Sequence, residues 1–219
     1  RDMRFVYADA PVGHSMFGRA VPCICQREHI TERARRMLEE LDGLLPEERT
    51  RLFGSSELTP DNAEAFAAVT HALEAKRGQV VLWGAPGVGK THILHCAVNA
   101  ARNSGLTAVF STMTALLDYL RRAYDPEAKE SLDERWTLLL RADLLAIDEV
   151  NRFNGTQWAI QKAQELINER WRRMGDKLTM YSTNSAVSDL LPHVASRLSD
   201  GRGHVVFVGG TDRRLTKGA

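Results

Sequence analysis

The sequence has few cysteines, no long apolar run and almost no net charge. Its 3 cysteines are Cys23, Cys25 and Cys96. So low and odd a number argues against a disulfide framework and is typical of a reducing cytosol, so we expect a cytoplasmic protein. No apolar run approaches the roughly 18 residues that a membrane span needs, so we expect no membrane partner. Because 29 basic and 28 acidic residues leave a net charge of +1, any nucleic-acid surface has to be a local patch.

The N-terminal part of the sequence differs in pattern from the rest. Residues 1–28 are irregular and contain several prolines and glycines. From Ile30 onward, apolar residues recur at steps of three and four, which predicts a helix that Pro46 ends. We therefore expect a small N-terminal appendage, residues 1–57, followed by a larger domain, residues 58–219.

The larger domain alternates helices with short apolar strands. It opens with a helix that Thr59 caps, Pro60 starts and Gly78 ends. Because each crossover helix carries the chain back over the sheet, the alternation that follows predicts an α/β fold with a parallel five-stranded sheet flanked by helices. The predicted strands are QVVLW (79–83), TAVFS (107–111), LLAID (144–148), KLTMYST (177–183) and HVVFVG (204–209), and the helical regions between them are 90–103, 112–141 and 156–175.

A glycine-rich segment between the first strand and the next helix fits the pattern G-x-x-x-x-G-K-[ST]. Glycines let the backbone curl so that successive N–H groups point at phosphate oxygens, and the following helix offers its positive N-terminal end to the same anion. The lysine can reach the β- and γ-phosphates, and the threonine hydroxyl can ligate Mg²⁺. The pattern therefore predicts a site for ATP and Mg²⁺ formed by Gly84, Ala85, Pro86, Gly87, Val88, Gly89, Lys90 and Thr91.

Two acids and one amide follow later strands of the predicted sheet. Asp148 ends the strand LLAID, Glu149 directly follows it, and Asn184 follows KLTMYST. Parallel strands present their carboxyl ends at one edge, so these residues are expected near the phosphate loop. Asp148 would hold Mg²⁺ together with Thr91, Glu149 would polarise an attacking water, and Asn184 would orient that water.

In this order, these motifs resemble an AAA+ ATPase. The closer resemblance is to helicase loaders of the DnaC/DnaI type and to IstB-like ATP-binding proteins, and it covers roughly residues 58–214. The segments that carry it are GAPGVGKTH, RADLLAIDEV, TQWAIQKAQELINERW, YSTN, VASRLSDG and GGTDRR.

The resemblance implies further roles for individual residues. His92 closes the Walker A segment, Asp148 and Glu149 resemble Walker B, and Asn184 resembles sensor 1. Arg197 is similar to the arginine that reaches a neighbouring subunit's nucleotide, and Arg213 resembles a sensor-2 arginine. Relatives often carry an arginine where this sequence has His193, and loaders often carry Asp where it has Glu149.

The resemblance also implies partners. An arginine supplied in trans makes hydrolysis depend on an ATP-dependent homo-oligomer. Single-stranded DNA is expected on the segment between the second and third strands, where basic groups would neutralise phosphates and aromatic rings would stack on bases. Its residues of these kinds are Tyr119, Arg121, Arg122, Tyr124, Lys129, Arg135, Trp136 and Arg141.

Several functional alternatives remain open from the sequence. The leading hypothesis is a helicase loader that acts on a replicative helicase in DNA replication. The rivals are an IstB-like transposition helper that acts on a transposase, a nucleotide-gated binding module with negligible turnover, and a P-loop small-molecule kinase. The helix near residues 28–45 could dock on a partner protein or pack on its own ATPase domain.

The cysteine pair near the N-terminus raises the question of zinc. Cys23 and Cys25 lie in VPCIC, and His14 or His29 could join them. A closed zinc site needs four ligands, so we expect no bound zinc within this sequence. The stretch nevertheless resembles the second half of a zinc-knuckle hairpin, which cysteines ahead of Arg1 would complete.

Overall fold

The structure is a computed structural model that describes residues 5–7, 20–22, 36–153 and 155–213. The chain forms two compact units, Arg1–Glu40 and Leu41–Ala219. In the first unit, β1 (Phe5–Tyr7) pairs antiparallel with β2 (Ala20–Pro22). The cysteines Cys23 and Cys25, the histidines considered with them and residues 30–35 of the helix predicted from Ile30 lie outside the described residues, and residues 36–41 of that helix are helical.

The second unit is built on a parallel sheet, which confirms the predicted fold class. Its five strands lie in the order β4-β5-β6-β3-β7, and each neighbouring pair is parallel. All carboxyl ends therefore lie at one edge of the sheet. The strands are β3 (Gly78–Trp83), β4 (Ala108–Thr112), β5 (Leu144–Asp148), β6 (Leu178–Thr183) and β7 (His204–Phe207).

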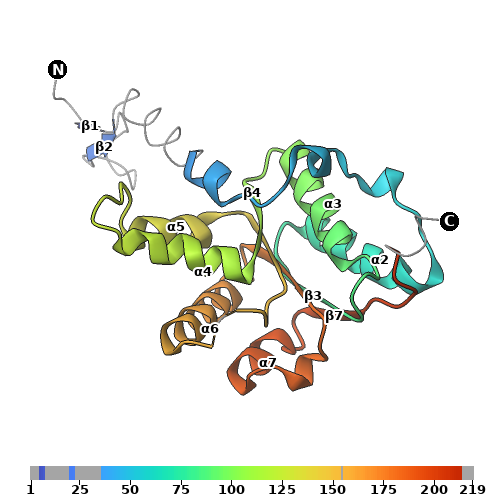
Figure 1. The fold of residues 1–219 in the computed structure, drawn as a ribbon. Coiled ribbons are helices and arrows are strands. Elements are labelled where there is room, and N and C mark those ends of the chain that lie inside the picture. Colours follow the sequence, from blue (N-terminus) through green and yellow to red (C-terminus); the bar gives the residue numbers. More distant parts are fainter. Residues whose placement is uncertain (1–4, 8–19, 23–35, 154, 214–219) are drawn as a thin grey trace. The chain divides into compact units, whose positions relative to one another are not determined.

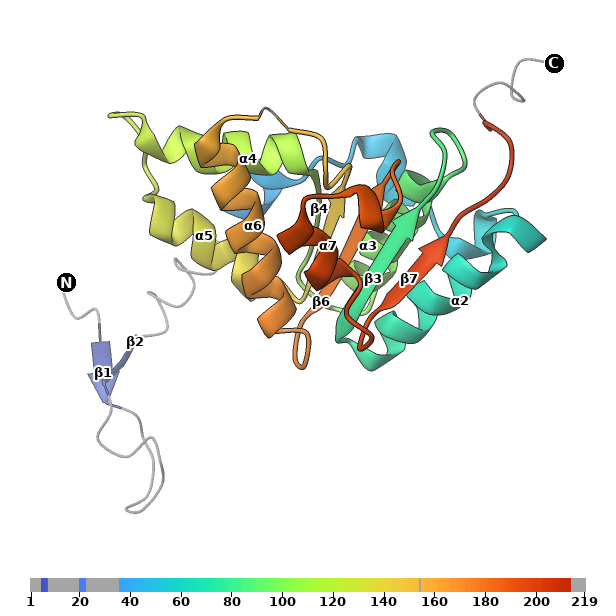
Figure 2. The ribbon, with the colours of Figure 1, turned by 90° about the horizontal axis from the view of Figure 1, so that it is seen from below.

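Helices cover both faces of this sheet. Helices α2 and α3 pack on one face, α6 and α7 lie over the other, and α4 and α5 lie beside α6 (Figures 1 and 2). The helices are α2 (Pro60–Ala75), α3 (Lys90–Asn103), α4 (Met113–Arg121), α5 (Leu132–Arg141), α6 (Gln157–Arg172) and α7 (Pro192–Leu198), with short 3₁₀ helices η1 (Pro46–Thr50), η2 (Phe53–Ser55), η3 (Arg122–Tyr124) and η4 (Val187–Asp189).

Two predicted helices have different bounds in the structure. The region 112–141 is two helices rather than one, because η3 and a loop containing Pro126 interrupt it and a new capping box begins at Ser131. The helix expected to end at Gly78 ends at Ala75, and Lys76 takes the left-handed conformation with φ 55°.

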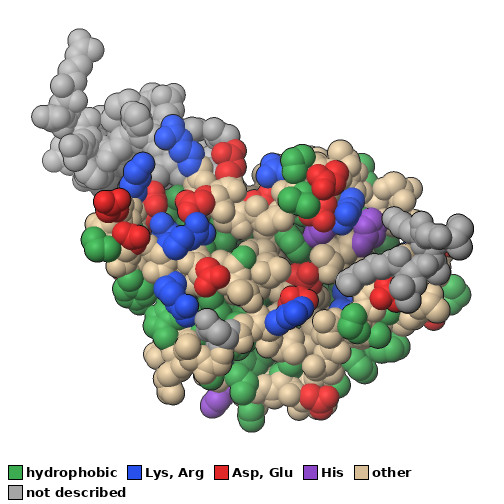
Figure 3. Space-filling model, viewed as in Figure 1, with side chains coloured by type: hydrophobic (Ala, Val, Ile, Leu, Met, Phe, Trp, Pro, Cys, Tyr) green, Lys and Arg blue, Asp and Glu red, His purple; other side chains and the backbone are tan. Residues whose placement is uncertain are grey.

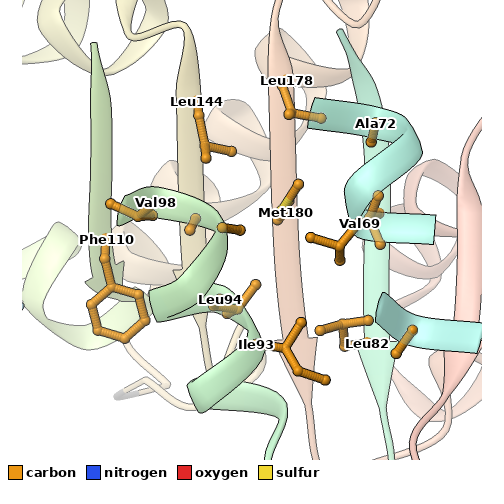
Figure 4. Packing of buried hydrophobic residues seen from close by; sticks show 14 of the residues in the cluster. Val69, Ala72, Leu82, Ile93, Leu94, Val98, Phe110, Leu144, Leu178 and Met180 are labelled. Atoms are coloured by element: carbon orange, nitrogen blue, oxygen red, sulfur yellow. The ribbon is translucent and has the colours of Figure 1, made fainter. Parts of the chain in front are cut away.

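The main core fills the space between the sheet and helices α2 and α3. Val69 from α2 and Leu94 from α3 point toward Leu82 and Met180 on the neighbouring strands β3 and β6 (Figure 4). These side chains are fully buried. Apolar burial on this face fixes α3 against the strands, and α3 begins directly after the glycine-rich loop.

Candidate functional site

The glycine-rich loop joins β3 to α3. As the sequence predicts, β3 ends at Trp83 and α3 begins at Lys90. Gly84 has φ 151° and Gly87 has φ 82°, which other residues rarely adopt. A Cβ at Gly84 would also lie 2.3 Å from the carbonyl oxygen of Val208. The loop needs glycine at these positions to curl as tightly as a phosphate cradle requires.

The side chain of Lys90 is held across this loop. Its Nζ donates hydrogen bonds to the carbonyl oxygens of Gly84 (2.8 Å) and Ala85 (2.7 Å). The residue is only 5% exposed, whereas Ala85 and Pro86 are exposed at the tip of the loop. The ammonium group is therefore fixed beside the backbone that would surround a bound anion.

Thr91, Asp148 and Ser182 form a hydrogen-bonded cluster next to the loop. Thr91 Oγ1 donates to Asp148 Oδ2 (2.8 Å), and Ser182 Oγ donates to Asp148 Oδ1. β5 and β6 are parallel neighbours, so their carboxyl ends lie side by side. Sequence reasoning missed Ser182. The available signal was a hydroxyl group two residues before Asn184, because such residues share one side of a strand.

The cluster fits a magnesium ion. Mg²⁺ prefers carboxylate and hydroxyl oxygens, and Thr91 and Asp148 supply both. Asp148 is 6% exposed, and within the described part of the chain no lysine or arginine pairs with it. A carboxylate whose hydrogen-bond partners are hydroxyl groups is a suitable ligand for a cation.

Glu149 follows Asp148 in a strained backbone conformation. Its φ is 49°, which is unusual for a residue with a long side chain. Its N–H donates to Ser182 Oγ (3.1 Å), and its carboxylate pairs with Arg152 (3.0 Å). Ser182 therefore fixes both the carboxylate of Asp148 and the backbone of Glu149.

The segment after β7 returns to the glycine-rich loop. The N–H of Gly209 donates to the carbonyl oxygen of Asp61 (3.1 Å), and the N–H of Arg213 donates to that of Gly87 (3.1 Å). A Cβ placed at Gly89 would lie 3.8 Å from Arg213 Nε. The backbone and side chain of Arg213 thus lie at the loop, at the edge where its sequence-based role requires it.

The buried polar face of α3 holds the segment that precedes α2. His92 Nε2 hydrogen-bonds with Ser56 Oγ (2.8 Å), so this side chain contacts that segment. Asn99 donates to the carbonyl oxygen of Arg51 (2.9 Å), and Arg51 Nη1 donates to His95 Nδ1 (2.7 Å). Burial lowers the pKa of His95 to about 4, so its ring is neutral near pH 7.

Asn184 and Arg197 differ in their distance from the loop. Asn184 is exposed and directly follows β6, next to the strand that carries Asp148. The carbonyl oxygen of Arg197 instead accepts a 2.9 Å hydrogen bond from Gln79 at the amino end of β3. Since a strand rises about 3.3 Å per residue, Gln79 and Gly84 lie about 16 Å apart. Arg197 therefore lies toward the sheet edge opposite the phosphate loop.

Two residues of the expected DNA surface are internal. Tyr119 is 1% exposed and Arg135 is 4% exposed, because the Arg135 guanidinium donates to the carbonyl oxygen of Tyr119 (2.6 Å) and stacks on its ring. Their expected contact with DNA is a packing contact in this structure. The other residues are exposed or half-buried: Arg121, Arg122, Tyr124, Lys129, Trp136 and Arg141.

The exposed part of this segment contacts Trp158, an aromatic residue that sequence reasoning missed. Trp158 of α6 packs edge to face against Tyr124, and the Arg121 guanidinium lies 4.9 Å from the Trp158 ring centre. Basic and acidic side chains alternate over α4 and α5 on the face seen in Figure 3. The patch is therefore aromatic and mixed in charge rather than strongly basic.

The described residues lack two further features. No cluster of three or more His, Cys, Asp or Glu side chains that could hold a metal ion occurs there. Among the helices of the same residues, none combines the length and apolarity needed to cross a membrane.

A family model described as "IstB-like ATP binding protein" matches residues 20–190. The chain belongs to this family. DnaA, the chromosomal replication initiator protein of Aquifex aeolicus (strain VF5), is 27% identical to this IstB-like chain over 99 residues, which are 44% of the chain and 24% of that protein. The IstB-like chain thus matches only about a quarter of the length of this curated relative.

Solved structures share the fold of this IstB-like protein at low sequence identity. One is the replication initiator DnaA bound to AMPPCP and single-stranded DNA, with a TM-score of 0.66, 20% identity, and coverage of 78% of this chain and 52% of that one. Another is the DnaC helicase loader, with a TM-score of 0.63, 15% identity, and coverage of 75% and 100%. The expected IstB-like family is thereby confirmed, and the expected fold is the one that the DnaC helicase loader and DnaI share with this chain.

Proposed function

We propose that this IstB-like protein binds ATP and Mg²⁺, hydrolyses ATP when assembled with copies of itself, and loads a replicative helicase on DNA in the cytoplasm. The observation that carries the proposal is the hydrogen bond between Thr91 and Asp148. It joins the glycine-rich loop to a buried carboxylate, which is the arrangement that a Mg²⁺-bound triphosphate needs.

Each residue of the site would have a distinct task. The loop backbone and Lys90 would bind the phosphates, and Thr91 with Asp148 would hold Mg²⁺, which would neutralise charge on the phosphate oxygens. Glu149 would accept a proton from the attacking water, and Asn184 would orient that water. Since Glu149 pairs with Arg152 in this structure, it would have to leave that partner to act as a base. Arg213 would contact the phosphates from the segment that crosses the loop.

Arg197 would act on the nucleotide of a neighbouring copy. Its position toward the opposite sheet edge supports action in trans, because its carbonyl oxygen is hydrogen-bonded to Gln79, which lies about 16 Å from Gly84 by the strand rise. An arginine supplied by a second subunit would stabilise charge that develops on the transferring phosphoryl group. Hydrolysis would therefore depend on an ATP-dependent homo-oligomer.

Single-stranded DNA would contact the exposed residues of α4, η3 and α5. Arg121 and Tyr124 offer a cation and an aromatic face there, and Tyr124 is 59% exposed. The second candidate is a transposition helper that acts on a transposase, since the sequence resembles IstB-type helpers and the chain belongs to the IstB-like family. Affinity capture with a purified replicative helicase and with a purified transposase separates the two, because each candidate predicts retention of only one partner.

Nucleotide binding and phosphate release together test the proposal. Wild type should bind ATP and release phosphate in the presence of Mg²⁺, Lys90→Ala should lose binding, and Glu149→Gln should bind ATP without turnover. Glu165→Gln, a change of the same kind on the surface of α6, is the control. Binding without turnover by wild type, with or without single-stranded DNA, would instead identify a nucleotide-gated binding module. No binding at all would contradict the whole proposal.

A further inference from the structure

The guanidinium of Arg197, a residue of α7, is held against helix α6. It stacks 4.0 Å from the ring centre of Trp171, and its Nε donates a 3.0 Å hydrogen bond to Asn168 Oδ1. Asn168 and Trp171 are three positions apart on α6, so both face α7, which carries Arg197. A half-exposed arginine on a short helix is thus held at two points.

These two contacts leave the outer end of the guanidinium available. Stacking uses one face of the group, and the hydrogen bond uses Nε. Among the described residues, Nη1 and Nη2 have no hydrogen-bond or ion-pair partner. Two parallel N–H donors at the outer end of a planar group suit a phosphate that approaches from outside.

The ring of Trp171 is itself fixed in place. Trp171 Nε1 donates to Asp200 Oδ2 (2.9 Å), and Arg202 binds both carboxylate oxygens of Asp200 at 3.0 Å. These hydrogen bonds, led by those from Arg202, hold the pKa of Asp200 well below its usual range. The Arg202 guanidinium also lies 4.8 Å from the Trp171 ring centre. The ring therefore has a set orientation rather than a choice of rotamers.

Buried hydrogen bonds anchor the helix turn that carries Asn168 and Trp171. Arg170 is fully buried and donates to the carbonyl oxygens of Leu178 at the start of β6 (2.5 Å) and Ala142 before β5 (2.8 Å). It thereby ties the last turn of α6 to the amino ends of two strands. Asn168 and Trp171 project from this anchored turn.

We propose that Trp171 and Asn168 are positioning residues that present Arg197 to the nucleotide of a neighbouring copy. The inference rests on the proposed trans role of Arg197 and adds how that role is prepared within a single subunit. An arginine side chain that is held before assembly does not lose conformational freedom when two copies meet. The contacts with Trp171 and Asn168 would therefore raise turnover, although neither residue touches the nucleotide.

The test compares ATP turnover in four variants of the full chain. Trp171→Leu removes the stacked face and should lower kcat about tenfold with KM for ATP unchanged, since only an interaction made during hydrolysis is lost. Trp171→Phe keeps an aromatic face and should retain most of the activity. Asn168→Ala should show an intermediate loss of kcat. Glu169→Gln, on the same turn but paired with Arg172 and Arg173 rather than with Arg197, should match wild type.

A mixing experiment separates positioning from a purely structural role. Trp171→Leu subunits keep an intact phosphate site, and Glu149→Gln subunits keep an intact Arg197. An equal mixture should hydrolyse ATP several-fold faster than the sum of the two proteins alone, because each Glu149→Gln subunit supplies its arginine to a Trp171→Leu site. A merely damaged fold would not be rescued in this way.

Loss of kcat with rescue by mixing supports the inference, and wild-type kcat in Trp171→Leu, or loss without rescue, overturns it. If Trp171→Leu does not fold, judged by circular dichroism, the same mixing experiment with Asn168→Ala decides. Failure of wild type to hydrolyse ATP under any condition would contradict the proposed function itself, which is a different result.

Discussion

Thr91 Oγ1 lies 2.8 Å from Asp148 Oδ2, and this hydrogen bond joins residues that are 57 positions apart in the sequence. Thr91 is in the first turn of α3, and Asp148 is the last residue of β5. They meet because the strands are parallel and their carboxyl ends share one edge of the sheet. The phosphate-binding loop and the candidate ligands for Mg²⁺ are thereby parts of one site.

Ser182→Ala is expected to weaken Mg²⁺ binding while ATP binding persists. Ser182 hydrogen-bonds both to the Asp148 carboxylate and to the N–H of Glu149, so its loss would loosen a metal ligand without removing it. Loss of such an outer partner typically lowers metal affinity by about tenfold or more. Phosphate release measured over a range of Mg²⁺ concentrations should show a higher half-saturation point. Ser188→Ala, at an exposed position, is the control, and an equal Mg²⁺ requirement in Ser182→Ala and wild type would remove Ser182 from the site.

Arg170→Met is expected to destabilise the fold strongly. Arg170 is fully buried, burial lowers its pKa to about 10, and its guanidinium satisfies several carbonyl oxygens and Thr179 Oγ1. Those partners would be left buried without donors, which predicts a loss of about 3–5 kcal/mol in the free energy of unfolding.

Chemical denaturation of Arg170→Met beside Arg172→Met measures this effect. Arg172 is on the same helix turn with 64% of its side chain exposed, so its replacement should change stability by less than about 0.5 kcal/mol. Equal stability of the two variants would show that the buried hydrogen bonds of Arg170 contribute little.

Stability is expected to fall between pH 6.5 and pH 4 because of His95. Burial lowers the pKa of His95 from its ordinary value of 6.5 to about 4, and Nδ1 accepts a hydrogen bond from Arg51. The unfolded chain therefore binds more protons than the folded chain in this range, so unfolding becomes easier as pH falls. The shift corresponds to about 3 kcal/mol lost by pH 4. His95→Gln, which keeps an acceptor for Arg51, should unfold with a shallower pH dependence. An unchanged slope would assign the acid sensitivity to other groups.

Local patterns in the sequence predicted most of the fold. LLAID is a strand at the residues expected, and the fixed spacing of Gly84, Lys90 and Thr91 predicted the loop. The break in the region 112–141 was missed because apolar spacing continues on both sides of Pro126, and the loop between the helices depends on that proline and on the Ser131 cap.

Contacts between distant elements could not be predicted in the same way. Ser182 and Trp171 contact partners on other elements. The spacing of Ser182 before Asn184 gives the side of the strand on which it lies, but in neither case does spacing identify the partner. Arginine side chains are usually exposed, but that of Arg135 is buried against the ring of Tyr119. Such assignments depend on how helices pack, which a periodic pattern leaves open.

ATP turnover per subunit, measured as a function of protein concentration, tests the central claim most directly. Arg197 lies toward the sheet edge opposite its own phosphate loop, and in the proposed mechanism a lone subunit would therefore lack an arginine at its nucleotide. We predict that turnover per wild-type subunit rises with concentration to a plateau, while Arg197→Ala binds ATP equally well and stays at least about 100-fold less active throughout. Turnover that is independent of concentration, with Arg197→Ala as active as wild type, would contradict the account.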